Sequence, residues 1–111
     1  MAVRTIIFRG KRIDNGEWVY GFIVKMFGTY HIIDKDDENT AYEVIPSTVG
    51  QYVGLKDKNG KRIFENGYMI IDKQTYKVLF DNGEYILKNI FNCDIIQLKN
   101  NSNIGVFVDE I

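Results

Sequence analysis

The clearest structural signal in the chain is the stretch Val49-Gly50-Gln51-Tyr52-Val53-Gly54-Leu55-Lys56-Asp57-Lys58-Asn59-Gly60-Lys61-Arg62-Ile63-Phe64. Apolar residues flank a short charged segment, and Asn59-Gly60 stands near its centre. Asn-Gly pairs favour the tight turns that join antiparallel strands, because both residues tolerate positive φ angles. The stretch therefore predicts a strand, a charged turn and a second strand.

A second hairpin is predicted further along the chain, where Asp81-Asn82-Gly83 separates two apolar segments. In the first segment, residues 75–80, aromatic and aliphatic residues fall at every second position, as on one face of a strand. Residues 84–88 form the returning strand. Further strands are expected at residues 3–8, 17–24, 29–33, 41–45, 68–71 and 104–108, the last of them at a sheet edge.

Short strands at spacings of about ten residues, joined by turns rich in Gly and Asn, indicate a mainly β fold. We expect a single domain over residues 1–111, built as a small antiparallel SH3-like or curled β-barrel with hairpin insertions. At most short helical turns are expected, such as one that begins at Pro46. Residues 89–98 suit either a strand or a short helix.

The charge of the chain is nearly balanced, with a net value of −1 over 111 residues. This balance disfavours a general binder of polyanions, which carries a clear basic excess. The sign nevertheless alternates in four blocks: +3 in residues 1–30, −4 in 31–50, +3 in 51–80 and −3 in 81–111. Mixed surfaces are normal in globular domains, and complementary patches for self-association are the alternative interpretation.

Cys93 is the only cysteine, which excludes an intramolecular disulfide and a cysteine-rich metal site. Arginine and lysine interrupt the apolar residues near the N-terminus, so no signal peptide is expected. No apolar stretch approaches the length of a transmembrane helix. We therefore expect a cytoplasmic protein without a membrane partner.

Catalytic groups are scarce in the sequence. His31 is the only histidine, and no spacing joins it to Ser47 and Asp34 as a triad would require. The acidic run at residues 34–38 lacks the glycine and the terminal carboxylate of a calcium-binding loop, so we interpret it as a solvated loop. We expect no enzyme activity, no catalytic or metal-binding residues and no cofactor.

One cationic cluster stands out on this nearly neutral chain, at the turn of the first hairpin. A basic turn beside aromatic residues can bind a nucleic-acid backbone and stack its bases. A solvated hairpin is the favoured alternative, because the chain as a whole lacks the basic excess of a dedicated nucleic-acid binder. The residues that would contact a partner or a nucleic acid are Tyr52, Lys56, Lys58, Lys61 and Arg62.

Residues 44–64, which begin with Val44-Ile45-Pro46 and end with the hairpin, resemble the signature of the YopX-like family of small phage and prophage proteins. The segments Phe8–Arg12 and Gly16–Gly21 resemble the opening of the same family. The resemblance implies a mainly β, phage-encoded protein that is able to oligomerise, and it supplies no catalytic residues. The chain departs from the family pattern at Asn66-Gly67, where family members have Gly-Asp.

Together these features predict a non-enzymatic accessory protein of a phage or prophage, acting in the bacterial host cytoplasm through protein–protein contacts and as a homo-oligomer. A small nucleic-acid-binding module that uses the Lys56–Arg62 turn is one alternative, although nucleic acid is not the favoured partner. A protein that inhibits or modulates a host protein, such as a defence protein, is the other.

Overall fold

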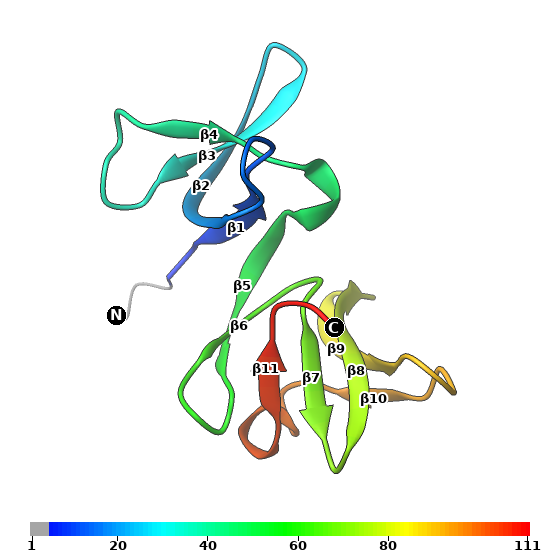
Figure 1. Cartoon of the computed structure of the whole chain (residues 1–111). Helices are drawn as coiled ribbons and strands as arrows, with labels where there is room; N and C mark the ends of the chain where they lie inside the picture. Colours follow the sequence, from blue (N-terminus) through cyan, green and yellow to red (C-terminus); the bar gives the residue numbers. More distant parts are fainter. Residues whose placement is uncertain (1–4) are drawn as a thin grey trace. The chain divides into compact units, whose positions relative to one another are not determined.

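The computed structural model describes residues 5–111, and the chain forms two compact units, Met1–Tyr52 and Val53–Ile111. Each unit is built on an antiparallel sheet (Figure 1). Strand β5 (Gly50–Lys56) begins in unit 1 and ends in unit 2. The single domain expected from the sequence stays a prediction.

In unit 1, four consecutive strands pair in the order β4-β3-β2-β1, and β5 returns to pair with β1. A 3₁₀ turn begins at Pro46, as the sequence predicted, because proline presets the first helical φ angle. The elements of unit 1 are β1 (Phe8–Lys11), β2 (Trp18–Met26), β3 (Thr29–Asp34), β4 (Ala41–Glu43), η1 (Pro46–Thr48) and the start of β5.

The sheet of unit 1 is curled, so that the residue after β4, at one edge of the sheet, pairs with the residue after β1. A single antiparallel bridge joins Arg12 to Val44, and the backbone N–H of Ile13 donates to the carbonyl oxygen of Glu43 at 3.1 Å. Val44 is 1% exposed and packs against Gly10 on the inner face. The sheet is therefore curled, but it does not form the closed barrel expected from the sequence.

The first strand begins later than the sequence predicted. A strand was expected at residues 3–8, but β1 begins at Phe8, and residues 5–7 are not in a strand; residues 3 and 4 lie outside the described residues. In β1, Arg9 is 1% exposed, and its guanidinium carbon lies 3.9 Å from the centre of the Trp18 ring. Hydropathy alone misses this strand because a cation–π contact lets a charged side chain be buried.

Unit 2 holds a five-stranded sheet with the strand order β10-β9-β8-β7-β11, whereas β5 and β6 continue the other sheet. Residues 89–98, left open between strand and helix, form a turn followed by a short strand. The elements are the end of β5, β6 (Arg62–Phe64), β7 (Tyr68–Ile71), β8 (Gln74–Asp81), β9 (Glu84–Asn89), β10 (Ile95–Gln97), η2 (Ser102–Ile104) and β11 (Val106–Val108).

Both predicted hairpins are confirmed in this part of the chain. In the β8–β9 hairpin, Asn82 and Gly83 have φ angles of 50° and 81°, as a tight two-residue turn requires. The core of unit 2 gathers side chains that are at most 1% exposed, and burying one such aliphatic or aromatic side chain contributes about 1.5–3 kcal/mol. These side chains are Ile63, Met69, Val78, Leu87, Leu98 and Phe107.

The fold is mainly β, as predicted, with two antiparallel sheets and short 3₁₀ turns among the described residues. The two sheets do not close into a barrel. Within residues 5–111, no helix has the length and apolar character needed to span a bilayer.

Candidate functional site

The turn between β5 and β6 is held by a compact set of backbone hydrogen bonds. The N–H of Asp57 donates to the carbonyl oxygen of Lys61 at 2.8 Å, and the N–H of Gly60 donates back to the carbonyl oxygen of Asp57 at 3.0 Å. Asn59-Gly60 lies at the tip, as the sequence predicted. The turn is therefore a defined loop on which charged side chains are displayed.

Asp57 is only 6% exposed, and its carboxylate holds this turn together from the inside. Its Oδ1 accepts the N–H groups of Asn59 at 2.9 Å and of Lys61 at 2.8 Å. Its Oδ2 accepts the N–H of Phe107, which lies in β11, at 2.8 Å. One side chain thus joins the hairpin turn to the edge strand of the sheet.

Two opposing influences act on the ionisation of Asp57. Burial is the largest single influence and raises the pKa of its carboxyl group. The N–H donors of Phe107, Lys61 and Asn59, together with the Lys61 charge, outweigh burial, so the pKa lies below its ordinary value. Asp57 is therefore ionised at neutral pH.

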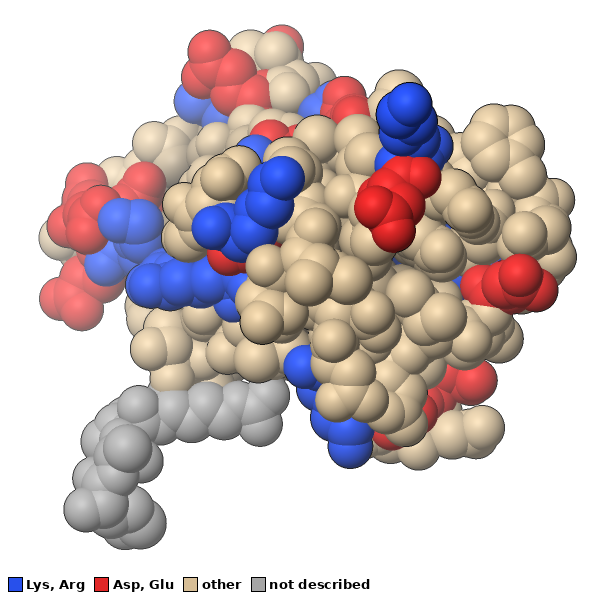
Figure 2. All heavy atoms as spheres, turned by 90° about the horizontal axis from the view of Figure 1, so that it is seen from below, with Lys and Arg blue, Asp and Glu red and all other residues tan. Residues whose placement is uncertain are grey.

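The four cationic side chains predicted as contact residues, Lys56, Lys58, Lys61 and Arg62, are all exposed on this turn. Of these, Lys61 has its Nζ 3.7 Å from Oδ2 of Asp109 and 5.5 Å from the centre of the Phe107 ring. Exposed groups of both charge signs are visible on the face of the molecule drawn in Figure 2. The turn therefore combines a fixed backbone with accessible positive charge.

Tyr52, the aromatic residue predicted to accompany this cluster, is 7% exposed in β5, and Phe64 is 4% exposed. Their rings are therefore not presented beside the turn as surfaces on which a base could stack. The four cations are thus exposed at the turn, whereas the aromatic residue that the sequence suggested as their partner is buried.

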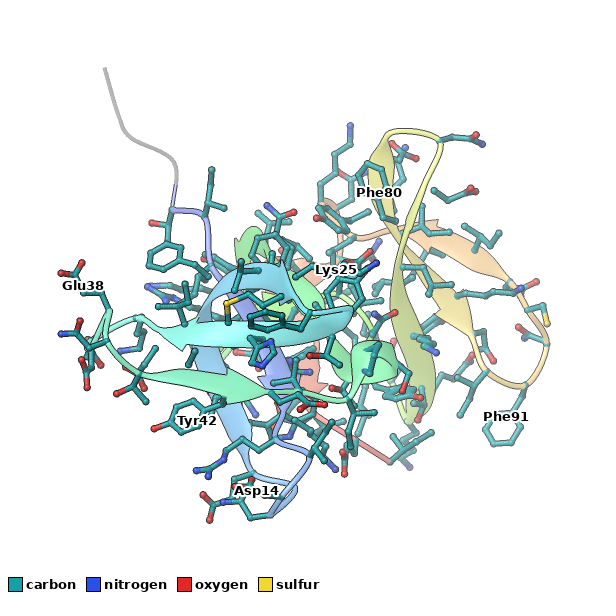
Figure 3. All side chains as sticks on the ribbon, turned by 90° about the horizontal axis from the view of Figure 1, so that it is seen from above. Asp14, Lys25, Glu38, Tyr42, Phe80 and Phe91 are labelled. Atoms are coloured by element: carbon teal, nitrogen blue, oxygen red, sulfur yellow. The ribbon has the colours of Figure 1, made fainter. Side chains whose placement is uncertain are left out.

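An oppositely charged loop lies in unit 1, between β3 and β4. Its fold is set by Asp37, whose carboxylate accepts the hydroxyl of Thr40 at 2.5 Å and the N–H of Asn39 at 3.1 Å. The Thr40 hydroxyl and the Asn39 N–H lower the pKa of Asp37. Glu38 projects outward from this loop (Figure 3). No group of three potential metal ligands forms here or elsewhere in residues 5–111.

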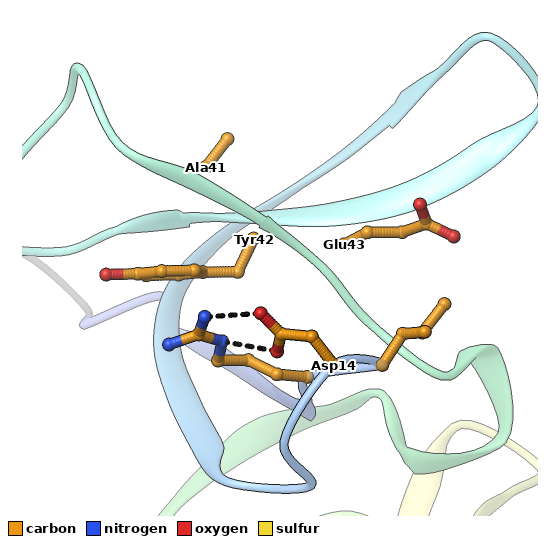
Figure 4. A pocket seen from close by; sticks show the side chains of 6 residues that line it. Asp14, Ala41, Tyr42 and Glu43 are labelled. Carbon is orange, nitrogen blue, oxygen red and sulfur yellow. Dashed lines mark hydrogen bonds and ion pairs between the residues drawn. The ribbon is translucent and has the colours of Figure 1, made fainter.

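Sequence reasoning missed a third charged feature, a cavity of about 320 Å³ at the curl of unit 1 (Figure 4). The guanidinium group of Arg12 lies on the ring of Tyr42, with its carbon 4.4 Å from the ring centre. Its Nε and Nη2 donate to the two oxygens of Asp14 at 2.9 and 2.6 Å. This hydrogen bonding raises the pKa of Arg12 and lowers the pKa of Asp14.

The signal for this ion pair was present in the sequence, because Arg12 and Asp14 flank one residue at the entry to a turn. The stacking on Tyr42 was not visible, since it depends on the return of β4 to β1. His31 lies opposite Glu43 in the β3–β4 register, and its Nδ1 is buried without a hydrogen-bond partner among the described residues.

The fold and the candidate site define a small, mainly β protein that displays a fixed cationic hairpin turn. The family model of the YopX protein matches residues 7–108, so the chain belongs to the YopX family. This confirms the resemblance seen in the sequence. No curated protein matches the chain.

The departure from the family pattern at Asn66-Gly67 has a structural counterpart. Asn66 has a φ angle of 70°, and its N–H donates to the carbonyl oxygen of Val78 at 2.8 Å. Asparagine is among the few residues other than glycine that adopt this conformation readily. Asn66 therefore meets the backbone requirement at the position where the family pattern has glycine.

Proposed function

We propose that this chain is a non-enzymatic accessory protein of a phage or prophage that acts in the bacterial cytoplasm through protein–protein contacts and self-assembly. The observation that supports the proposal is the pair of exposed, oppositely charged loops. Residues 56–62 carry four cationic side chains and one carboxylate, a net charge of +3. Residues 34–40 carry four carboxylates and one lysine, a net charge of −3.

These loops suit contact between copies because each belongs to a different unit of the chain. The basic turn of one copy would dock on the acidic loop of the next, which makes a head-to-tail interface that closes into a ring or extends as a filament. Complementary potentials steer such an encounter and set its register. The one carboxylate of the turn, that of Asp57, is buried and accepts three backbone N–H groups, so the exposed side chains of the turn are cationic.

The edge of β11, which the sequence suggested as a pairing surface between subunits, is less suited to that role. The carboxylate of Asp57 accepts the N–H of Phe107, and the N–H of Lys58 donates to the carbonyl oxygen of Gly105 at 3.1 Å. Groups that an added strand would need are already used within unit 2. The charged loops therefore support the assembly proposal better than this edge does.

The proposal is tested by the molar mass in solution, measured by light scattering over a range of protein concentrations. We expect a mass above one subunit at low salt and dissociation near 1 M NaCl, where the screening length is about 3 Å. A triple charge reversal, Lys58→Glu with Lys61→Glu and Arg62→Glu, should also dissociate the assembly. The matched control reverses Lys25, Lys73 and Lys99, which are exposed outside the turn, and should leave the mass unchanged.

A monomer at every concentration would overturn the assembly proposal. The exposure of all four turn cations keeps single-stranded nucleic acid as the second candidate partner, bound through its phosphates. The same triple reversal separates the two, because a nucleic-acid binder loses salt-dependent binding to an oligonucleotide without any change in the mass of the free protein.

A further inference from the structure

Unit 2 carries a cavity of about 320 Å³ that none of the predicted sites includes. Its lining residues come from the β8–β9 hairpin and from the turn that follows β9. This volume is at the lower end of the range for small-molecule sites. The residues that line it are Lys77, Leu79, Lys88, Asn89, Ile90 and Cys93.

Two lysines converge on the cavity from neighbouring strands. Lys77 and Lys88 are direct partners in the β8–β9 register, so their side chains leave the same face of the sheet about 5 Å apart at Cβ. Like charges placed directly opposite each other destabilise a sheet. Neither lysine forms an ion pair with the described part of the chain.

One wall of the cavity is fixed by Asn89, which is 3% exposed. Its side-chain oxygen accepts the N–H groups of Phe91 at 2.9 Å and Asn92 at 3.2 Å, and its side-chain nitrogen donates to Gln74 at 2.7 Å. The turn at residues 90–93 is therefore held in place before any ligand binds, and Phe91 projects from it (Figure 3).

The rest of the lining is apolar, since Leu79 and Ile90 contribute aliphatic side chains. A ligand that satisfies the whole cavity has an anionic group for the two ammonium groups and a short hydrocarbon body for the aliphatic wall. We propose that this cavity binds a small amphiphilic anion, a carboxylate or phosphate carried on a short apolar chain, between Lys77 and Lys88.

Cys93 provides a direct probe, because it is exposed, lines the cavity and is the only cysteine in the chain. Iodoacetate and iodoacetamide alkylate the thiolate at the same sulfur but differ in charge. The two ammonium groups should speed the reaction with the anionic reagent. We expect Lys77→Gln with Lys88→Gln to lower the iodoacetate-to-iodoacetamide rate ratio by about threefold or more. The control Lys73→Gln with Lys99→Gln, which changes the net charge equally, should leave the ratio unchanged.

Ligand binding is then measured as protection of Cys93 from neutral iodoacetamide. Hexanoate and hexyl phosphate should protect in a saturable manner and show which anionic group is preferred, whereas hexylammonium, with the same hydrocarbon chain, should not. Inorganic phosphate alone should protect less, because it leaves the aliphatic wall unused. Equal protection by hexanoate and hexylammonium, or protection that survives the Lys77 and Lys88 substitutions, would overturn the proposal.

Discussion

Asp57 shows how one carboxylate can hold a hairpin turn and a distant strand together. It accepts three backbone N–H groups, and two of the donors, Asn59 and Lys61, lie in the turn while the third, Phe107, lies in β11. The change Asp57→Asn places an amide NH₂ where one of these donors points. We expect a loss of about 2 kcal/mol in the free energy of unfolding, measured by urea denaturation at pH 7. The exposed control Asp72→Asn should change it little.

The same carboxylate gives the stability a defined dependence on pH. Because the pKa of Asp57 is lower in the folded chain than in the unfolded chain, its contribution is complete above the ordinary carboxyl pKa of about 4. The contribution is lost as the pH falls from there through the lowered pKa. As the pH falls from about 5 to below about 4, the free energy of unfolding of the wild-type chain should therefore decrease more than that of the Asp57→Asn variant. Parallel pH curves for the two proteins would contradict this assignment.

Asn89 plays the corresponding role at the end of β9. Replacing it by alanine removes the acceptor of the Phe91 and Asn92 N–H groups, which lie in a part-buried turn. We expect a loss of about 2 kcal/mol in the free energy of unfolding, because these donors regain only part of their hydration. The control Asn103→Ala, on an exposed residue, should stay close to the wild-type value in the same urea titration.

The hairpins are the elements that the sequence predicts best, because their information is local. The β8–β9 turn needs positive φ at two successive residues, and Asn82-Gly83 supplies them. A Cβ added at Gly83 would meet no atom within 4 Å, so Gly83→Ala tests the backbone requirement alone. We expect a cost of about 1–2 kcal/mol in urea unfolding. Asn82→Gly should cost much less, because glycine adopts the positive φ angle at position 82 readily. Equal costs for the two variants would show that the positive φ angle does not cause the loss of stability.

The elements that the sequence missed depend on partners far along the chain. Strand β1 was misplaced because burial of Arg9 depends on Trp18 in the next strand. The segment after β9 stayed ambiguous because its turn is held by a side chain, Asn89, that local propensity does not weigh. The candidate site likewise has one feature that the sequence shows and one that depends on the fold. Its charges follow from composition, whereas the burial of Tyr52 depends on how the fold is packed.

The whole molecule presents opposite charges on two separate units, and this arrangement makes the proposed assembly testable by exchange of charge. One variant carries an acidic turn, with Lys58, Lys61 and Arg62 each changed to Glu. The other carries a basic loop, with Asp36→Lys and Glu38→Lys. Each variant alone has two loops of like sign, so each should remain a monomer in light scattering at low salt, because like charges at a contact repel.

An equal mixture of these two variants should assemble, since the acidic turn of one fits the basic loop of the other and the two unchanged loops also complement each other. The mixed assembly should alternate the two chains and dissociate as salt rises, because its contacts are exposed ion pairs. Assembly of either variant alone would show that the contact does not depend on these loops. A mixture that stays monomeric, while the wild-type chain assembles, would place the interface on other surfaces of the two units.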